Sequence, residues 1–459
     1  MKNKRVRNKK IFYNVVIIFN ILLIVGLILY YGYRLVYFYQ LEHQKPKAIK
    51  YVHEKIKASN ELVSEGDGLY LDDKNQVFYF KGKVLNNYLY YSGKMWRVIK
   101  INQDGSMVLI LNDVISALTY GSSSKYQESS LRGYLNTITN QPFTGIFEQT
   151  LNDKNQYLKK TSICIDQISN IEDITCDKKV TLDFVGLLNL SDYQLSGGKN
   201  GYLNHHISYY TATTDNHDRL YYVHSKGGVT LTDDYKEHNY GVRPTITLKK
   251  NISYISGDGT ETNPYIIEPK EEKTMIHIGN YVSYSGYTWK VISKDDQTYK
   301  LATSSLLTDK TGQVYMRNYA TKNNLYQVKT YGSLAYYLNT NWYRTLIDKS
   351  LIVDGTWYTG NYQINGVTDY KNIYTDSISA KVGLLHVGEL YSLELPNTWL
   401  MTTVNEDDDM VYSVDQNGKY FSDMIDSEHG IRPAIYITNQ IQIVSGTGVL
   451  SDPYVIGGM

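Results

Sequence analysis

Cysteine and proline are scarce in this sequence, and the motifs of common enzymes are absent. The 459 residues include two cysteines and eight prolines, too few cysteines for a disulfide framework or a thiolate metal site. No phosphate-binding loop, nucleophile elbow, HExxH helix or paired-carboxylate pattern is found in the sequence. The sequence therefore predicts a protein that is not an enzyme, without catalytic residues, a metal site or a cofactor.

Acidic residues are missing from the first ten positions, which carry six lysines and arginines. Residues 11–33 follow without a single formal charge. Because about 20 helical residues cross a hydrocarbon core of about 30 Å, this segment predicts an uncleaved transmembrane helix in the lipid bilayer. A secretory signal has an apolar region of only about 7–15 residues, so cleavage is the poorer interpretation. The basic residues 1–10 predict a cytoplasmic tail and a body outside the cell membrane.

Charge is divided unequally along the chain. Residues 1–50 hold ten of the 47 lysines and arginines but one of the 46 acidic residues, so the remainder is net acidic. Such a body is a poor partner for nucleic acid. Tyrosine is abundant, with 46 residues. A low-GC genome explains this abundance, and an amphipathic aromatic surface for sugars or peptides is the alternative explanation.

A spacer is expected between the membrane and the body, over residues 34–66. Within it, Ile49, Val52, Ile56 and Leu62 recur at helical spacing. We expect a stalk that holds the body off the membrane.

The two cysteines, Cys164 and Cys176, both lie in the part that is expected outside the cell. An oxidising compartment favours a disulfide between them, worth on the order of 3 kcal/mol by the chain-entropy argument. A free reactive thiol is the alternative.

The body contains an internal repeat, which consists of blocks in the same order. The blocks are 91–110 with 284–302, 130–137 with 333–340, 180–188 with 382–390, 210–214 with 399–403, 240–248 with 429–437, and 256–267 with 445–456. The first block predicts a hairpin and aligns Trp96 with Trp289, both expected in the core, and the second predicts an amphipathic helix with a serine at its start. This order predicts two tandem α+β domains, residues 67–268 and 275–459, joined by a charged linker at 268–274.

Each repeat ends with GVRP or GIRP followed by a GxGxxxxPY segment. This pattern resembles a repeat domain of surface proteins in Gram-positive Firmicutes, for which no activity is assigned. The part from Trp399 to Ile437 is also similar to C-type-lectin-like and formylglycine-generating-enzyme-like domains. The resemblance implies C-type-lectin-like α+β domains. The calcium-binding tripeptide of lectins and the C-terminal cysteine pair of formylglycine-generating enzymes are missing, so the resemblance supports a fold and not an activity.

The loops after the two Thr-Thr pairs are the expected ligand contacts. They contain Asp215, His217 and Asp218 in the first repeat, and Glu406, Asp407, Asp408 and Asp409 in the second. Clustered carboxylates are compatible with Ca²⁺, which takes six to eight oxygens, but we favour a solvated hairpin tip. Trp399 is expected at the surface, because Tyr210 replaces it in the first repeat and keeps a ring.

Other conspicuous residues have structural explanations. Arg243 and Arg432, in the matched Arg-Pro pairs, are expected to tie strands to carbonyls or carboxylates. His205 and His206 have no accompanying nucleophile and are expected at the surface. The GDG at 257–259 is expected to form a turn.

These observations predict a membrane-anchored binding or adhesion protein. Its two tandem domains would contact an unknown extracellular ligand, which is a glycan, a wall polymer or a protein. Duplication favours binding, because two linked sites raise the effective concentration. One alternative is a cell-envelope enzyme of the formylglycine-generating type, which needs two reactive cysteines. Another alternative is a scaffolding subunit of a surface apparatus.

Overall fold

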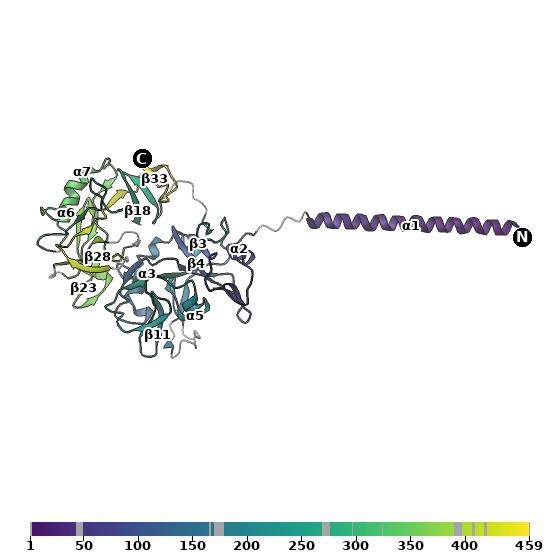
Figure 1. The fold of residues 1–459 in the computed structure, drawn as a ribbon, viewed down its shortest axis with the longest axis horizontal. Coiled ribbons are helices and arrows are strands. Elements are labelled where there is room, and N and C mark those ends of the chain that lie inside the picture. Colours follow the sequence, from purple (N-terminus) through teal and green to yellow (C-terminus); the bar gives the residue numbers. More distant parts are fainter. Residues whose placement is uncertain are drawn as a thin grey trace. The chain divides into compact units, whose positions relative to one another are not determined.

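The structure of the chain is a computed structural model (Figure 1). It describes residues 2–42, 49–164, 167–168, 179–268, 276–295, 297–323, 325–389, 397–405, 409–416 and 420–458. Contacts within the chain divide it into two units, residues 1–50 and residues 51–459. The chain combines helices and strands and is mostly sheet.

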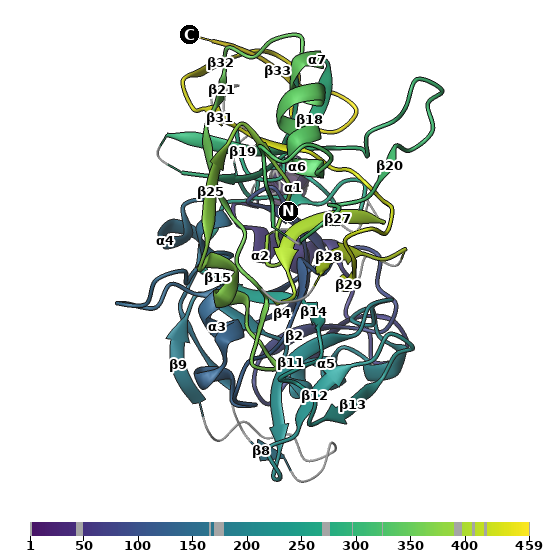
Figure 2. The same ribbon diagram turned by 90° about the vertical axis from the view of Figure 1, so that its left-hand side faces the viewer.

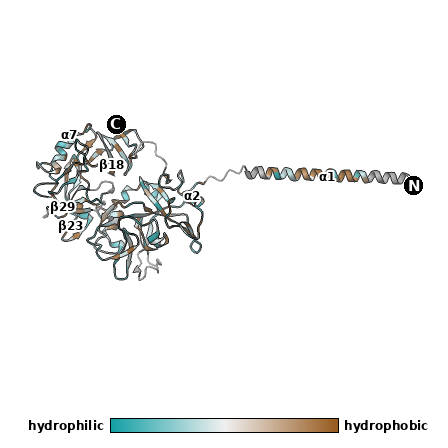
Figure 3. Cartoon of the chain, viewed as in Figure 1, coloured by the Kyte–Doolittle hydropathy of each residue, from teal (hydrophilic) through white to brown (hydrophobic). Residues whose placement is uncertain are grey.

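The first unit is one long helix, α1, which spans Lys2–Glu42. Its segment Phe12–Val36 has 25 residues and is long and apolar enough to cross a membrane. Figure 3 shows the hydrophobic residues along this helix. The prediction for residues 11–33 is therefore confirmed as far as an apolar, membrane-length helix is concerned.

The second unit contains two large sheets of eight strands each among the described residues. The strands of the first are β1 Gly68–Asp72, β2 Val77–Lys81, β3 Tyr88–Tyr91, β4 Lys94–Ile101, β5 Met107–Leu111, β10 Val185–Leu187, β15 Pro244–Leu248 and β16 Tyr265–Ile266. The strands of the second are β17 Tyr281–Tyr284, β18 Tyr287–Lys294, β19 Thr298–Thr303, β21 Ile352–Val353, β26 Val382–Gly383, β31 Ala434–Thr438, β32 Ile441–Ser445 and β33 Tyr454–Gly458.

Two smaller sheets accompany the large ones. One contains β6 Ser116–Leu118, β8 Gln167–Ile168, β11 Tyr209–Asp215, β12 Leu220–Val223, β13 Val229–Thr232 and β14 Tyr240–Val242. The other contains β20 Met316–Arg317, β27 Thr398–Thr403, β28 Met410–Val414, β29 Tyr420–Met424 and β30 His429–Gly430. Three two-stranded ladders pair β7 Thr161–Cys164 with β9 Lys179–Asp183, β22 Gly355–Tyr358 with β25 Ser377–Ala380, and β23 Gln363–Ile364 with β24 Val367–Thr368.

Short helices connect these strands. They are α2 Val52–Ser59, η1 Tyr126–Glu128, α3 Ser130–Leu135, η2 Glu148–Thr150, α4 Lys154–Tyr157, α5 Leu190–Leu195, η3 Gly198–Asn200, α6 Leu334–Tyr336, the π-helical turn η4 Tyr337–Trp342, α7 Tyr343–Thr345 and η5 Tyr370–Tyr374. The predicted serine is confirmed as the helix cap in the second repeat, at Ser333, whereas in the first repeat the cap is Ser129 and the predicted Ser130 is the first helical residue. The side chain of Ser129 accepts the N–H of Arg132, and that of Ser333 accepts the N–H of Tyr336.

The internal repeat is visible in the order of the strands. The order β3-β4-β5-β15-β10, with β16 beside β3, corresponds to β17-β18-β19-β31-β26, with β33 beside β17. The order β13-β12-β11-β14-β6 likewise corresponds to β29-β28-β27-β30-β20. In Figure 2 the elements of the second repeat lie above those of the first. Buried residues of both repeats belong to one hydrophobic core, so the prediction of two tandem domains at 67–268 and 275–459 stays a prediction.

The hairpins predicted around an Asp-containing turn are confirmed, because β4 pairs antiparallel with β5 and β18 pairs antiparallel with β19. A second hairpin, which the sequence did not predict, precedes each of them. The β3–β4 turn places Ser92 and Gly93 at φ 58° and 70°, and the β17–β18 turn places Ser285 and Gly286 at φ 52° and 82°. Two successive residues with positive φ are typical of the two-residue turn whose twist fits an antiparallel hairpin. Trp96 and Trp289 follow these turns and are fully buried, as predicted.

The expected stalk is wrong for its second half. Val52 and Ile56 lie in α2 and are fully buried in the core, whereas Ile49 and Leu62 are exposed. Tyr51 also begins the second unit. Helical spacing alone did not distinguish a free stalk from a helix that packs on the body.

The alignment of residues 180–188 with 382–390 is also wrong, by five residues. Val185 pairs with Ile246, and Val382 pairs with Ile435. The two isoleucines are matched through the Arg-Pro blocks, so Val185 corresponds to Val382.

Candidate functional site

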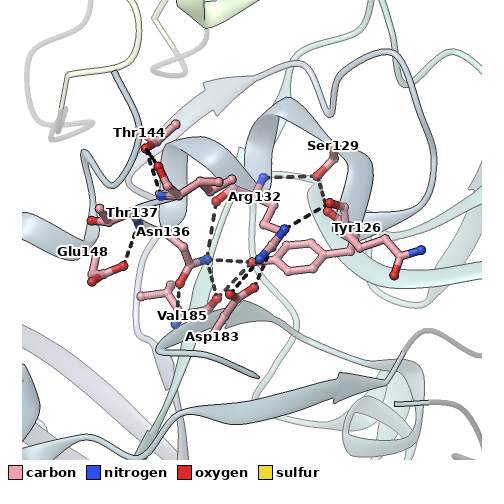
Figure 4. Close-up of polar contacts among 11 residues, drawn as sticks. Tyr126, Ser129, Arg132, Asn136, Thr137, Thr144, Glu148, Asp183 and Val185 are labelled. Carbon is pink, nitrogen blue, oxygen red and sulfur yellow. Dashed lines mark hydrogen bonds and ion pairs between the residues drawn. The ribbon is translucent and has the colours of Figure 1, made fainter. Parts of the chain in front are cut away.

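An asparagine in the first repeat holds a strand to a helix (Figure 4). Asn136 follows α3, and its Nδ2 donates to the carbonyl of Val185 at 2.8 Å. Its Oδ1 accepts the N–H of Val185 at 3.0 Å, and the hydroxyl of Tyr126 donates to the same carbonyl at 2.9 Å. The amide thus satisfies both backbone groups of one buried residue.

The second repeat contains the same clamp. Asn339 Nδ2 donates to the carbonyl of Val382 at 2.9 Å, and its Oδ1 accepts the N–H of Val382 at 3.0 Å. Tyr326 donates its hydroxyl to that carbonyl at 3.1 Å. The matched asparagines and tyrosines therefore have a structural role, and this explains why the helix block is repeated.

An ion pair accompanies the clamp in the first repeat (Figure 4). Arg132 binds Asp183 through Nε at 2.8 Å and through Nη2 at 3.0 Å, a bidentate geometry that fits a carboxylate. The hydrogen bond to Asp183 raises the pKa of Arg132. Alanines stand at the corresponding positions 335 and 380 of the second repeat, so this pair is not duplicated.

The first predicted ligand loop is a tightly bonded turn. Asp215 is 4% exposed, and its carboxylate accepts the N–H groups of His217 at 3.0 Å and Arg219 at 2.8 Å. Arg219 also donates its Nε at 2.9 Å. Burial raises the pKa of Asp215, but these bonds from Arg219 and His217 bring it below its ordinary value. The carboxylate of Asp215 therefore caps the turn, and Asp218 occupies the turn with φ 60°. The expectation of Asp215 as a ligand contact stays a prediction.

The second loop falls largely outside the described residues, which exclude Glu406, Asp407 and Asp408. Asp409 is exposed, and its carbonyl accepts the N–H of Ile425 at 3.0 Å. Among the described side chains no group of three His, Cys, Asp or Glu could hold a metal ion. The pairing of Cys164 with Cys176 also lies outside the described residues.

Trp399 does not lie at the surface, contrary to expectation. It is 1% exposed, and its Nε1 donates to the carbonyl of Arg317 at 2.8 Å. Tyr319 packs against its ring with a centroid separation of 5.5 Å. In the first repeat Tyr210 occupies the same place and packs on Tyr120 at 5.1 Å. The Trp-to-Tyr exchange therefore preserves a buried ring and carries no information about a ligand.

The matched arginines bind backbone carbonyls, as predicted. Arg243 donates its Nε to Leu111 O at 2.7 Å, and Arg432 donates its Nε to Thr303 O at 2.8 Å. Both side chains are buried, and each ties the Arg-Pro strand to the end of a neighbouring strand.

The matched glycine turns explain the GxGxxxxPY pattern. The second glycines, Gly259 and Gly448, have φ values of 87° and 80°, and a Cβ at either position would overlap the ring of Tyr265 or Tyr454. The carbonyl of each glycine accepts an N–H from the first strand of the hairpin. The predicted turn at 257–259 is confirmed, and it closes the repeat onto its own beginning.

The paired histidines differ in exposure. His206 is exposed, as expected. His205 is partly buried, and its Nε2 lies 2.9 Å from Oδ1 of Asp113. Burial lowers the pKa of His205. The partner Asp113 is 92 residues away in sequence, which is why local sequence did not reveal it.

A buried charged cluster in the second repeat has no signal in the sequence. Lys300 Nζ lies 2.5 Å from Oε1 of Glu389, and the N–H of His386 donates to Oε2 of Glu389 at 2.8 Å. All three residues are buried. Lys300 Nζ also lies 4.6 Å from the ring centroid of Trp357, a favourable position for a cation. Because a buried charge needs its partner, removal of either Lys300 or Glu389 would leave an uncompensated charge in the core.

Burial and the neighbouring charges shift the pKa values of His386 and Glu389. Burial lowers the pKa of His386 below 6.5. Burial raises the pKa of Glu389, but the charges of His386 and Lys300 outweigh this effect and lower it. In the first repeat Asn189 and Asp192 correspond to His386 and Glu389.

Hydrogen bonds and rings join the two repeats along a seam. The hydrogen bonds are Thr119 N to Tyr362 Oη at 3.0 Å, Thr119 Oγ1 to Thr368 O at 2.9 Å, and Ser116 Oγ with Tyr420 Oη at 3.2 Å. The rings of Tyr134 and Tyr370 meet edge to face at 5.4 Å, and those of Phe143 and Tyr374 stack at 4.6 Å. We call these residues the inter-repeat seam. Part of the tyrosine content thus serves contacts within the body.

Comparison of the chain with protein-family models, with curated proteins and with solved structures finds no match.

Proposed function

We propose that the chain is a membrane-anchored binding or adhesion protein. Residues 1–10 remain in the cytoplasm, α1 spans the membrane, and residues 51–459 form an extracellular body. The basic tail and the apolar segment Phe12–Val36 support this arrangement. We also propose that the repeats are C-type-lectin-like domains of the Firmicutes surface type, on the strength of their shared end pattern.

The observation that carries the binding proposal is the exposed ring of Tyr331, which packs on the partly buried Tyr336. Tyr331 is 86% exposed, the most exposed of the described tyrosines in residues 51–459. Its ring meets that of Tyr336 edge to face at 5.6 Å. A tyrosine presents an apolar face and a polar tip, which suits contact with a sugar or a peptide. By contrast, residues that the two repeats share, such as Asn136 and Asn339, make hydrogen bonds within the body.

Retention on immobilised ligands tests the proposal. Full-length protein in detergent is applied to glycan arrays and to purified wall polymer, with and without Ca²⁺. We expect retention on at least one polymer and a loss of about tenfold or more in affinity for Tyr331→Ala, typical of a truncated aromatic contact. Ile347→Ala, at another exposed position of the second repeat, is the matched control. No retention on any glycan or wall polymer would leave only protein ligands.

A thiol titration distinguishes binding from the formylglycine-generating alternative. We expect no free thiol in the native protein before reduction and two after it, from Cys164 and Cys176. Two reactive thiols without reductant would favour the enzyme.

A further inference from the structure

The second large sheet ends in β32, a strand whose outer side has no neighbouring strand among the residues that the structure describes. β32 forms its last position, beside β33. Residues 439–451 contain no charged residue and no proline, the features that commonly protect an edge from pairing. Val444 is 67% exposed, and Val449, Leu450 and Val455 are exposed nearby in the sequence.

The corresponding edge of the first repeat is covered. Ser253, which matches Gln442 through the glycine turns, pairs antiparallel with Tyr51. The N–H of Val52 donates to the carbonyl of Ile252 at 3.0 Å. The helix α2 follows, and Lys55 Nζ lies 5.5 Å from the ring centroid of Tyr254. Residues 51–59 thus supply both the backbone partner and the cover.

The covering segment occurs once in the chain. It lies before β3 in the first repeat. The residues that lie equally far before β17, the counterpart of β3, already begin in β15 of the first repeat. Among the described residues, β32 pairs with β33 alone. The first repeat therefore shows that this edge accepts an antiparallel strand, and the second repeat leaves the edge open.

We propose that β32 pairs antiparallel with β32 of a second copy of the chain and so forms a dimer. Antiparallel pairing of a strand with itself is symmetric, so the interface closes after two copies. The uncharged sequence brings no like charges together across the pair. The inference rests on residues 51–459 and not on the proposed ligand.

Sedimentation of the full-length protein in detergent tests the dimer. We expect a monomer–dimer equilibrium in which Val444→Lys weakens association by at least about tenfold, because a lysine on an edge strand opposes pairing. Ile347→Lys, at an exposed site of the same repeat outside β32, should associate like the native chain. As a second measurement, amide hydrogen exchange at residues 441–445 should slow as the concentration of the native chain rises.

Two results would overturn the proposal. One is a native chain that stays monomeric and shows no concentration-dependent protection at 441–445. The other is a dimer that Val444→Lys leaves intact and whose exchange at 441–445 is unchanged, which would place the contact in α1 or on another surface.

Discussion

Ile56→Ala distinguishes a free stalk from a helix that belongs to the body. Ile56 is 0% exposed and lies in the core with Val52. Replacing a buried isoleucine by alanine costs about 2–5 kcal/mol, through lost burial and the cavity that remains. The helix α2 has only eight residues, and two of them lie in the core. The loss of packing should therefore first loosen α2 itself.

Leu62→Ala is the matched control. Both residues belong to the same helical-spaced series, but Leu62 is 52% exposed, so its truncation should change stability by no more than about 0.5 kcal/mol. Urea unfolding of the full-length protein in detergent, followed by tryptophan fluorescence, gives the midpoints. Amide exchange at residues 52–59 reports whether α2 opens separately. If both variants lowered the midpoint equally little, and exchange in α2 were already fast in the native chain, the packed position of α2 would be refuted.

Four further predictions follow from the structure. Asn339→Ala should lower the urea midpoint by an amount equivalent to about 2–4 kcal/mol, because two buried backbone groups of Val382 lose their partners. His386→Asn should reduce the acid sensitivity of the melting temperature below pH 6.5. Burial depresses the folded pKa of His386, so its stabilising contribution is complete above the unfolded value and is lost as the pH falls through the folded value. Trp399→Ala should cost about 3–5 kcal/mol in thermal or urea unfolding, as expected of a buried ring, whereas a surface ligand contact would leave stability unchanged. Protease added to intact cells should remove the body and spare a tag at the N-terminus, and digestion of the tag would reverse the proposed orientation.

Local sequence predicted those parts of the fold that local geometry determines. The Asp-containing turns between β4 and β5 and between β18 and β19, the serine cap at Ser333 and the glycine turn at 257–259 each depend on a few neighbouring residues. The arginines of the Arg-Pro pairs were also interpreted correctly, because a long cation between apolar strand residues needs buried acceptors. Repetition of these patterns in one order then indicated the duplicated strand order.

Contacts between distant residues could not be predicted in this way. Lys300 and Glu389 are 89 residues apart, and neither has a neighbour in sequence that identifies it as buried. The inter-repeat seam joins residues separated by more than 200 positions. Val52 and Ile56 had the spacing of a helix, but only the packed structure shows which surface they cover.

Trp399 shows how a substitution between repeats can mislead. Tyr210 keeps a ring with a polar tip, and that similarity first favoured an exposed contact. Both polar tips, however, bond a buried carbonyl: Trp399 Nε1 that of Arg317 at 2.8 Å, and Tyr210 Oη that of His238 at 2.7 Å. The polar atom of a buried Trp or Tyr needs a hydrogen-bond partner, so a ring with a polar tip does not by itself indicate a ligand contact.

The two repeats also separate structural residues from candidates for recognition. Asn136 and Asn339 form the same bonds, so the clamp has been retained in both. The ion pair of Arg132 with Asp183 is present once, and Ala335 and Ala380 stand at the matched positions of the second repeat. Residues under this common constraint cannot vary with a ligand. For the proposed binding role we therefore expect recognition at positions that differ between the repeats and face solvent, and Tyr331 is such a position.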